Sequence, residues 1–92
     1  MDDETLKTYA YVDISRYRRD TVKTLKGEVK TPTAIARDSG IRTNHISKVL
    51  KELKEVGVAE CINEDVRKGR LYRLTSTGDK IAKYMKNDEN IK

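Results

Sequence analysis

The strongest constraint on the fold is a pair of closely spaced helical segments in residues 31–57, TPTAIARDSGIRTNHISKVLKELKEVG. Thr31 can cap the free amides of a helix start, and Pro32 fits the first helical position. Gly40 suits the left-handed residue that often follows a helix end. These signals predict a helix of roughly two turns that stops at a glycine turn just before another helix begins.

The second of these helices is predicted over residues 43–56 and is amphipathic. Four aliphatic residues recur at the spacing i, i+3, i+4 and i+7, namely Ile46, Val49, Leu50 and Leu53. At about 100° per residue they share one side of the helix, while Asn44, Lys48 and Lys51 lie on the opposite side. One side is therefore expected to pack and the other to face outward.

The remaining segments predict one domain over residues 14–86. Residues 14–27 suggest a helix whose packed side carries Ile14, Tyr17, Val22 and Leu25. Residues 58–63 and 70–75 suggest two short strands joined by the turn EDVRKG, which has basic residues at its tip, and Thr75 or Ser76 can cap a last helix. Residues 1–13 show no clear period and are treated as an N-terminal extension, and residues 87–92 are expected to fray.

Composition and charge narrow the function classes. The 92 residues make one small domain with a net charge of +5, and residues 14–31 alone hold six basic and two acidic side chains. Such a bias suits a polyanionic partner. One cysteine and one histidine cannot supply a disulfide or a four-ligand zinc site. No apolar run matches a membrane span or a signal peptide, so a cytoplasmic protein is expected.

No catalytic group stands out in the sequence. His45 and Ser47 are two residues apart on the predicted helix and point to different sides, so they cannot act as a base and nucleophile pair. There is no glycine-rich phosphate loop. We therefore expect a protein that is not an enzyme and that has neither a cofactor nor a catalytic or metal site.

The spacing of Ala36, Gly40 and Ile46 resembles the helix-turn-helix pattern of a small residue, a glycine four later and an aliphatic residue six after that. Together with ISKVLKELKEVGVAE and KGRLYRLTSTG, it is similar to the winged helix-turn-helix of ArsR/MarR-type regulators and a group of small archaeal relatives, over residues 14–86. The resemblance implies a mainly α fold with a β-hairpin wing (α+β). It also implies a recognition helix, about residues 43–56, in the DNA major groove, and a wing, about residues 58–74, on the backbone or minor groove.

The resemblance also nominates DNA-binding residues. Carried over by position, they are Thr43, Asn44, His45, Ser47, Lys48 and Lys51 on the helix and Arg67, Lys68 and Arg70 on the wing. Asparagine can pair with adenine, and lysine can donate to guanine or phosphate. Arg42 stands where the family often has a capping residue, so either Thr43 caps one residue later or Arg42 contacts a phosphate.

The function implied is sequence-specific binding of double-stranded DNA as a transcriptional regulator. A homodimer is expected because the two DNA-binding domains of a twofold-symmetric dimer match the two half-sites of a palindrome. Ile81, Tyr84 and Met85 are the best apolar candidates for its contact, unless they complete the monomer core. Two alternatives remain, a protein-interaction winged helix that does not bind DNA and a nonspecific chromosomal DNA-coating protein. The sequence does not indicate whether a small-molecule effector exists.

Overall fold

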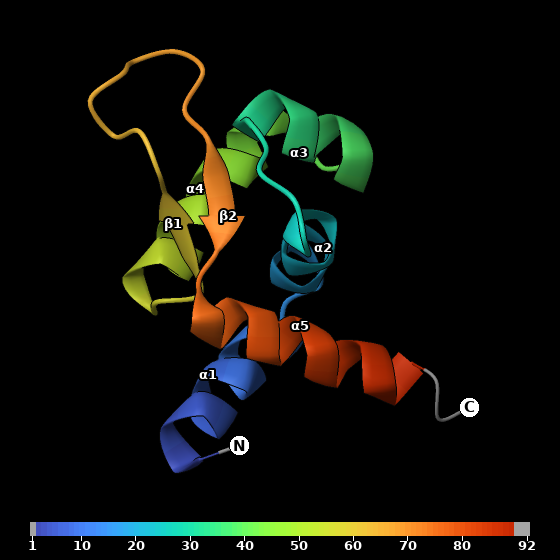
Figure 1. Cartoon of the computed structure of the whole chain (residues 1–92). Coiled ribbons are helices and arrows are strands. Elements are labelled where there is room, and N and C mark those ends of the chain that lie inside the picture. The colour runs from blue at the N-terminus through green and yellow to red at the C-terminus, as the bar shows by residue number, and fades with distance from the viewer. Residues whose placement is uncertain (1, 90–92) are drawn as a thin grey trace.

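The computed structural model describes residues 2–89, and their side chains as far as Met85. The elements in chain order are α1 (Asp3–Asp13), α2 (Arg16–Leu25), α3 (Pro32–Ser39), α4 (Thr43–Glu55), β1 (Ala59–Cys61), β2 (Tyr72–Leu74) and α5 (Ser76–Glu89). In Figure 1 the loop between β1 and β2 lies at the opposite end of the molecule from α1 and α5. The predicted mainly α architecture with one β-hairpin is confirmed. Within the described residues, no helix is both long and apolar enough to cross a membrane.

The turn between α3 and α4 forms as its local signals predict. Thr31 Oγ1 accepts a hydrogen bond from the amide of Ala34 at 3.1 Å, and Pro32 is the first helical residue. Gly40 has a φ of +76°, and its amide donates to the Ala36 carbonyl at 2.9 Å. A residue with a Cβ is strained in this left-handed conformation, so glycine lets the chain leave α3 and enter α4 within three residues.

The β-hairpin is antiparallel and shorter than predicted. Its register pairs Ala59 with Leu74 and Cys61 with Tyr72, so the strands occupy only the inner parts of residues 58–63 and 70–75. On the far side of β2, Tyr72 exchanges two backbone hydrogen bonds with Lys30, at 2.8 and 3.0 Å. The segment before α3 is thereby fastened to the hairpin, which places the start of α3 beside the wing.

The core lies between the helices and the inner face of the hairpin. Eight apolar side chains are completely buried, namely Val12, Val22, Leu25, Ile35, Ile46, Leu53, Val58 and Ile81. The aliphatic side of α4 is buried as predicted, since Val49 and Leu50 join Ile46 and Leu53 in this core. The amphipathic pattern of α4 therefore fixes which side of this helix faces solvent.

The first part of the chain differs from the sequence-based expectation. Residues 3–13 form α1, which ends so that Ile14 is its C-cap, and Ser15 Oγ then accepts the amide of Arg18 at 3.3 Å to start α2. Val22 is buried as predicted, but Ile14 is 78% exposed and Tyr17 is 41% exposed. The predicted packing of both residues was wrong. The cap at Ser15 takes Ile14 out of the helix, and Tyr17, within α2, lies against the exposed His45 on α4 instead of in the core.

The structure of the last helix shows whether its apolar residues are free for a dimer contact or belong to the monomer core. Thr75 is the cap, since its Oγ1 accepts the amide of Gly78 at 3.1 Å. Ile81 and Met85 are buried in the monomer core, so their proposed part in a dimer contact was wrong. Tyr84 is 42% exposed and its ring meets that of Tyr9 edge-on, with centroids 4.8 Å apart. Helix α5 continues through Glu89, and residues 90–92 of the predicted frayed tail lie outside the described residues.

One buried polar group yields a stability prediction. Thr21 in α2 is completely buried, and its hydroxyl has no hydrogen-bond partner among the described residues. Thr21→Val replaces this hydroxyl by a methyl group of similar size, so we expect the free energy of unfolding to rise by about 1 kcal/mol. Urea denaturation would measure the change. Thr33→Val, at an exposed position, is the control, and a loss of stability on replacing Thr21 would contradict the prediction.

Candidate nucleic-acid interface

The outward side of α4 is polar along its first three turns. Because its aliphatic residues are buried, six predicted contact residues are all exposed: Thr43, Asn44, His45, Ser47, Lys48 and Lys51. Arg42 occupies the N-cap position and makes no capping hydrogen bond, while Thr43 is the first helical residue. The alternative in which Thr43 is the cap was therefore wrong, and Arg42 remains an exposed cation at the helix start.

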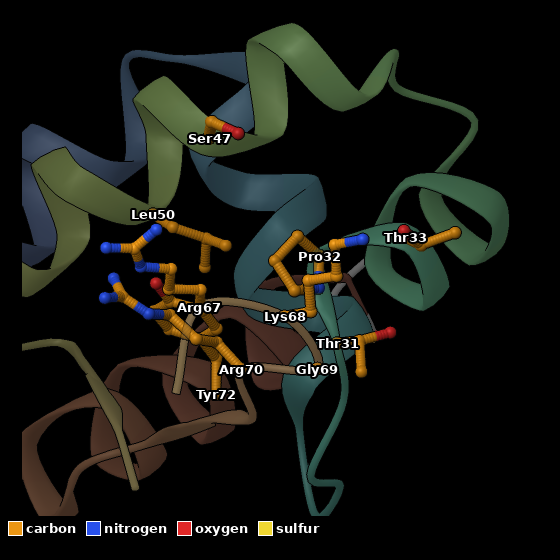
Figure 2. Close-up of a pocket in the computed structure, with 10 residues that line it drawn as sticks. All are labelled: Thr31, Pro32, Thr33, Ser47, Leu50, Arg67, Lys68, Gly69, Arg70 and Tyr72. Atoms are coloured by element: carbon orange, nitrogen blue, oxygen red, sulfur yellow. The ribbon is translucent and has the colours of Figure 1, made fainter. Parts of the chain in front are cut away.

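A groove of about 640 Å³ lies between this side of α4, the start of α3 and the wing. Figure 2 shows Ser47 and Leu50 on α4, Thr31 and Thr33 on the α3 side, and the wing residues facing them. The wing contributes Arg67, Lys68, Gly69, Arg70 and Tyr72 to the groove. The fold therefore brings together the three predicted wing cations and Ser47, which come from separate parts of the sequence.

Thr31 and Thr33 line this groove, although the sequence did not indicate them as site residues. Thr31 was identified only as a helix cap. Capping is a local signal, whereas the position of this helix start opposite the wing depends on the backbone pairing of Lys30 with Tyr72. No pattern within residues 31–39 could have indicated it.

A second hollow, of about 300 Å³, lies between α4 and the start of α2. It is lined by His45 and Lys48 from α4 and by Ser15 and Tyr17 from α2, among others. The rings of Tyr17 and His45 are in contact, with centroids 5.2 Å apart and planes tilted by 52°. Tyr17 was missed because its spacing with Val22 suggested a core position. The other predicted helix residues, Arg42, Thr43, Asn44 and Lys51, line neither of these two hollows.

The cations of this surface are not neutralised by the protein itself. Within residues 2–85, Arg42, Lys48, Lys51, Arg67 and Lys68 have no ion pair or side-chain hydrogen bond. Of the four acidic residues on α4 and the wing loop, Glu55 and Asp65 make no ion pair within the described residues, and the other two are held by other cations. Glu52 Oε1 lies 3.4 Å from Arg18 Nε, and Glu64 pairs with Lys54. The surface therefore keeps positive charge available for an anionic partner.

The ion pair between Lys54 and Glu64 also joins the wing to the C-terminal part of α4. The hydrogen bond from Lys54 lowers the pKa of the Glu64 carboxyl and raises the pKa of the Lys54 ammonium. Each partner thus favours the charged form of the other near neutral pH. The acidic Glu64 at the wing is turned towards Lys54 and does not cancel the charge of Arg67 or Lys68.

Arg70 differs from the other two wing cations. Its Nε donates to the Val66 carbonyl at 2.7 Å, and its Nη2 donates to the Glu64 carbonyl at 3.2 Å. Part of its hydrogen-bonding capacity is therefore used inside the wing loop. Arg67 and Lys68 have no such internal bonds within the described part of the chain.

Comparison with known proteins shows the fold. No family model matches the chain, and no curated protein matches its sequence. A solved structure of a mutant of ZitR from Lactococcus lactis is similar to 78% of this chain, with a TM-score of 0.66 and 20% sequence identity. The match covers 51% of the ZitR chain, so the present chain spans about half of its length. The fold is a winged helix, as the sequence predicted.

Proposed function

We propose that the protein binds double-stranded DNA sequence-specifically as a transcriptional regulator. The observation that carries this proposal is the exposed polar side of α4, flanked by cations that have no partner in the described part of the protein. These cations are Lys48 and Lys51 on α4, Arg42 at its N-cap, and Arg67 and Lys68 on the wing. A polyanion is the partner that such unpaired cations suit.

The dimensions of α4 suit the major groove of B-form DNA. Its 13 residues span about 20 Å, and the groove is about 12 Å wide, which admits one α-helix. With α4 in the groove, the amide of Asn44 is suited to adenine and the ammonium groups of Lys48 and Lys51 to guanine or phosphate. The hydroxyl groups of Thr43 and Ser47 serve either, and His45 lies on the side towards α2.

The two hollows beside α4 suit the two strands of phosphates that border the major groove. On the wing side, Arg67 and Lys68 would neutralise phosphates while Thr31 and Thr33 donate hydroxyl groups. On the α2 side, Tyr17 and Lys48 would meet the opposite strand. Arg42, exposed at the helix start, is proposed as a further phosphate contact. Such contacts provide affinity that weakens with salt.

We propose that the regulator is a cytoplasmic homodimer of the ArsR/MarR type, similar to the small archaeal group. Two DNA-binding domains related by a twofold axis would bind the two half-sites of a palindrome. With Ile81 and Met85 buried in the monomer, the large apolar residues that α1 and the described side chains of α5 leave exposed are Leu6 and Tyr84, at 48% and 42%. Tyr84 thus stays a candidate for the contact, and Leu6 takes the place of Ile81 and Met85.

Electrophoretic mobility shifts with pooled random duplexes, at two salt concentrations, test the proposed function. We expect binding at low salt, enrichment of particular sequences in the bound fraction, and weaker binding at the higher salt concentration. Absence of binding at low salt would support a protein-interaction winged helix. Equal recovery of all sequences would support a nonspecific DNA-coating protein.

Arg67→Ala is predicted to weaken binding to all sequences by a similar factor. Because the proposed contact is to phosphate, we expect the slope of log affinity against log salt to decrease by about 1. Titrations at four or more salt concentrations would measure the slope. Lys83→Ala removes one exposed cation from α5 and should leave the slope unchanged. A change in sequence preference without a change in slope would contradict a phosphate contact at Arg67.

A further inference from the structure

The wing loop, residues 62–71, has more internal order than its length suggests. Loops are generally more mobile than the elements that they connect. Here the backbone closes the base of the loop, since the Ile62 amide donates to the Leu71 carbonyl at 2.9 Å. Beyond that bond the strands no longer pair, and side chains bridge the two limbs of the loop.

Asn63 makes the first of these bridges. Its Oδ1 accepts the amide of Leu71 at 2.7 Å, and its Nδ2 donates to the carbonyl of Gly69 at 3.2 Å. One amide side chain thus satisfies a donor and an acceptor on the opposite limb, as a paired strand residue would. The thiol of Cys61 also donates to Asn63 Oδ1, at 3.5 Å.

Arg70 makes the second bridge, in the opposite direction across the loop. Its guanidinium donates to the carbonyls of Val66 and Glu64 through two different nitrogens. Because the guanidinium is planar and rigid, it holds both carbonyls in one arrangement, which a lysine ammonium cannot reproduce. Glu64 is in turn paired with Lys54 on α4, so this bridge is anchored to the helix that faces the groove.

We infer that Asn63 and Arg70 are positioning residues that hold the wing loop in its DNA-binding shape, and that Arg70 does not act chiefly as a phosphate contact. Between the two bridges lie Arg67 and Lys68, which are exposed and line the groove. With the loop held in place, little conformational freedom would be lost when these cations meet a backbone. The consequence for DNA affinity rests on the proposed function, whereas the order of the loop does not.

Arg70→Lys and Arg70→Ala separate positioning from charge. Lysine keeps the positive charge but cannot make the two hydrogen bonds to the Val66 and Glu64 carbonyls, and alanine loses both the charge and the bonds. We expect both variants to increase amide hydrogen exchange in residues 62–71 of the free protein, and to lower DNA affinity to a similar extent, roughly 3- to 10-fold. The salt slope should stay near that of the unaltered protein in Arg70→Lys. If Arg70→Lys matches the unaltered protein in both measurements while Arg70→Ala lowers the slope by about 1, the inference is wrong.

Asn63→Ala gives an independent test, because this residue carries no charge. We expect faster exchange throughout the loop and a loss of affinity similar to that of Arg70→Lys, with an unchanged salt slope. Asp65→Ala is the control for loop exchange, since the Asp65 side chain makes no bond within the described residues. Unchanged exchange in Asn63→Ala would overturn the inference. If the unaltered protein bound no DNA, the proposed function would fail, and the exchange measurements would still decide whether the bridges order the loop.

Discussion

Replacing Lys48 and Lys51 together by alanine is expected to lower DNA affinity by about 100-fold at low salt, since each contact to a base or phosphate contributes roughly 1–3 kcal/mol. Both side chains are exposed on the outward side of α4. Neither has a partner within the described residues, so their removal breaks no internal bond. The thermal transition of the protein should therefore shift little. Fluorescence anisotropy with a selected duplex and thermal denaturation would measure the two effects.

A second pair of lysines provides the matched control for this experiment. Lys80 and Lys83 are exposed on α5, at the end of the molecule away from the wing, and their replacement by alanine removes the same charge. Affinity should then fall much less. Equal losses in the two double variants would mean that net charge alone governs binding. Destabilisation by the Lys48 and Lys51 changes, with binding spared, would mean that α4 does not present this side to DNA.

Gly78→Ala is expected to destabilise the protein by about 3 kcal/mol, through overpacking against a rigid neighbour. A Cβ on Gly78 would collide with the backbone carbonyl oxygen of Val58 and would lie 3.1 Å from Leu74 Cβ. The Val58 carbonyl cannot move freely, because it accepts the Thr75 amide at 3.0 Å. Because the whole free energy of unfolding of a native domain is only about 5–15 kcal/mol, the expected loss is a large part of it.

Urea denaturation would measure the effect of Gly78→Ala, and Asp79→Ala at the neighbouring exposed position of α5 is its control. We expect the control to change stability by about 0.5 kcal/mol or less. Helix propensity alone predicts the opposite sign for Gly78→Ala, a gain of about 1 kcal/mol. A gain of that kind would show that α5 does not press on the loop that follows α4.

The elements that could be predicted from the sequence are those specified by neighbouring residues. Thr31, Pro32 and Gly40 define the limits of α3 because capping and backbone conformation depend on a few adjacent residues. The buried and exposed sides of α4 follow from its amphipathic spacing, and all its predicted aliphatic residues are buried. The winged-helix fold was also predicted, through its resemblance to a known family. These features include the polar surface from which the proposed function is argued.

The tertiary structure alone decided how distant segments meet. It showed that Ile81 and Met85 belong to the monomer core, that Tyr17 lies against His45, and that Arg70 bonds within its own loop. A hydrophobic period indicates that one side of a helix is apolar, but it does not identify the surface that will cover that side. Likewise, the backbone conformation and hydrogen-bonding groups of a glycine or an arginine are the same whether solvent or another part of the backbone surrounds it. The sequence around such a residue therefore does not show what it contacts. The contact between Gly78 and Val58 exists because residues 20 apart in the chain are packed together, and only packing determines what a side chain there would encounter.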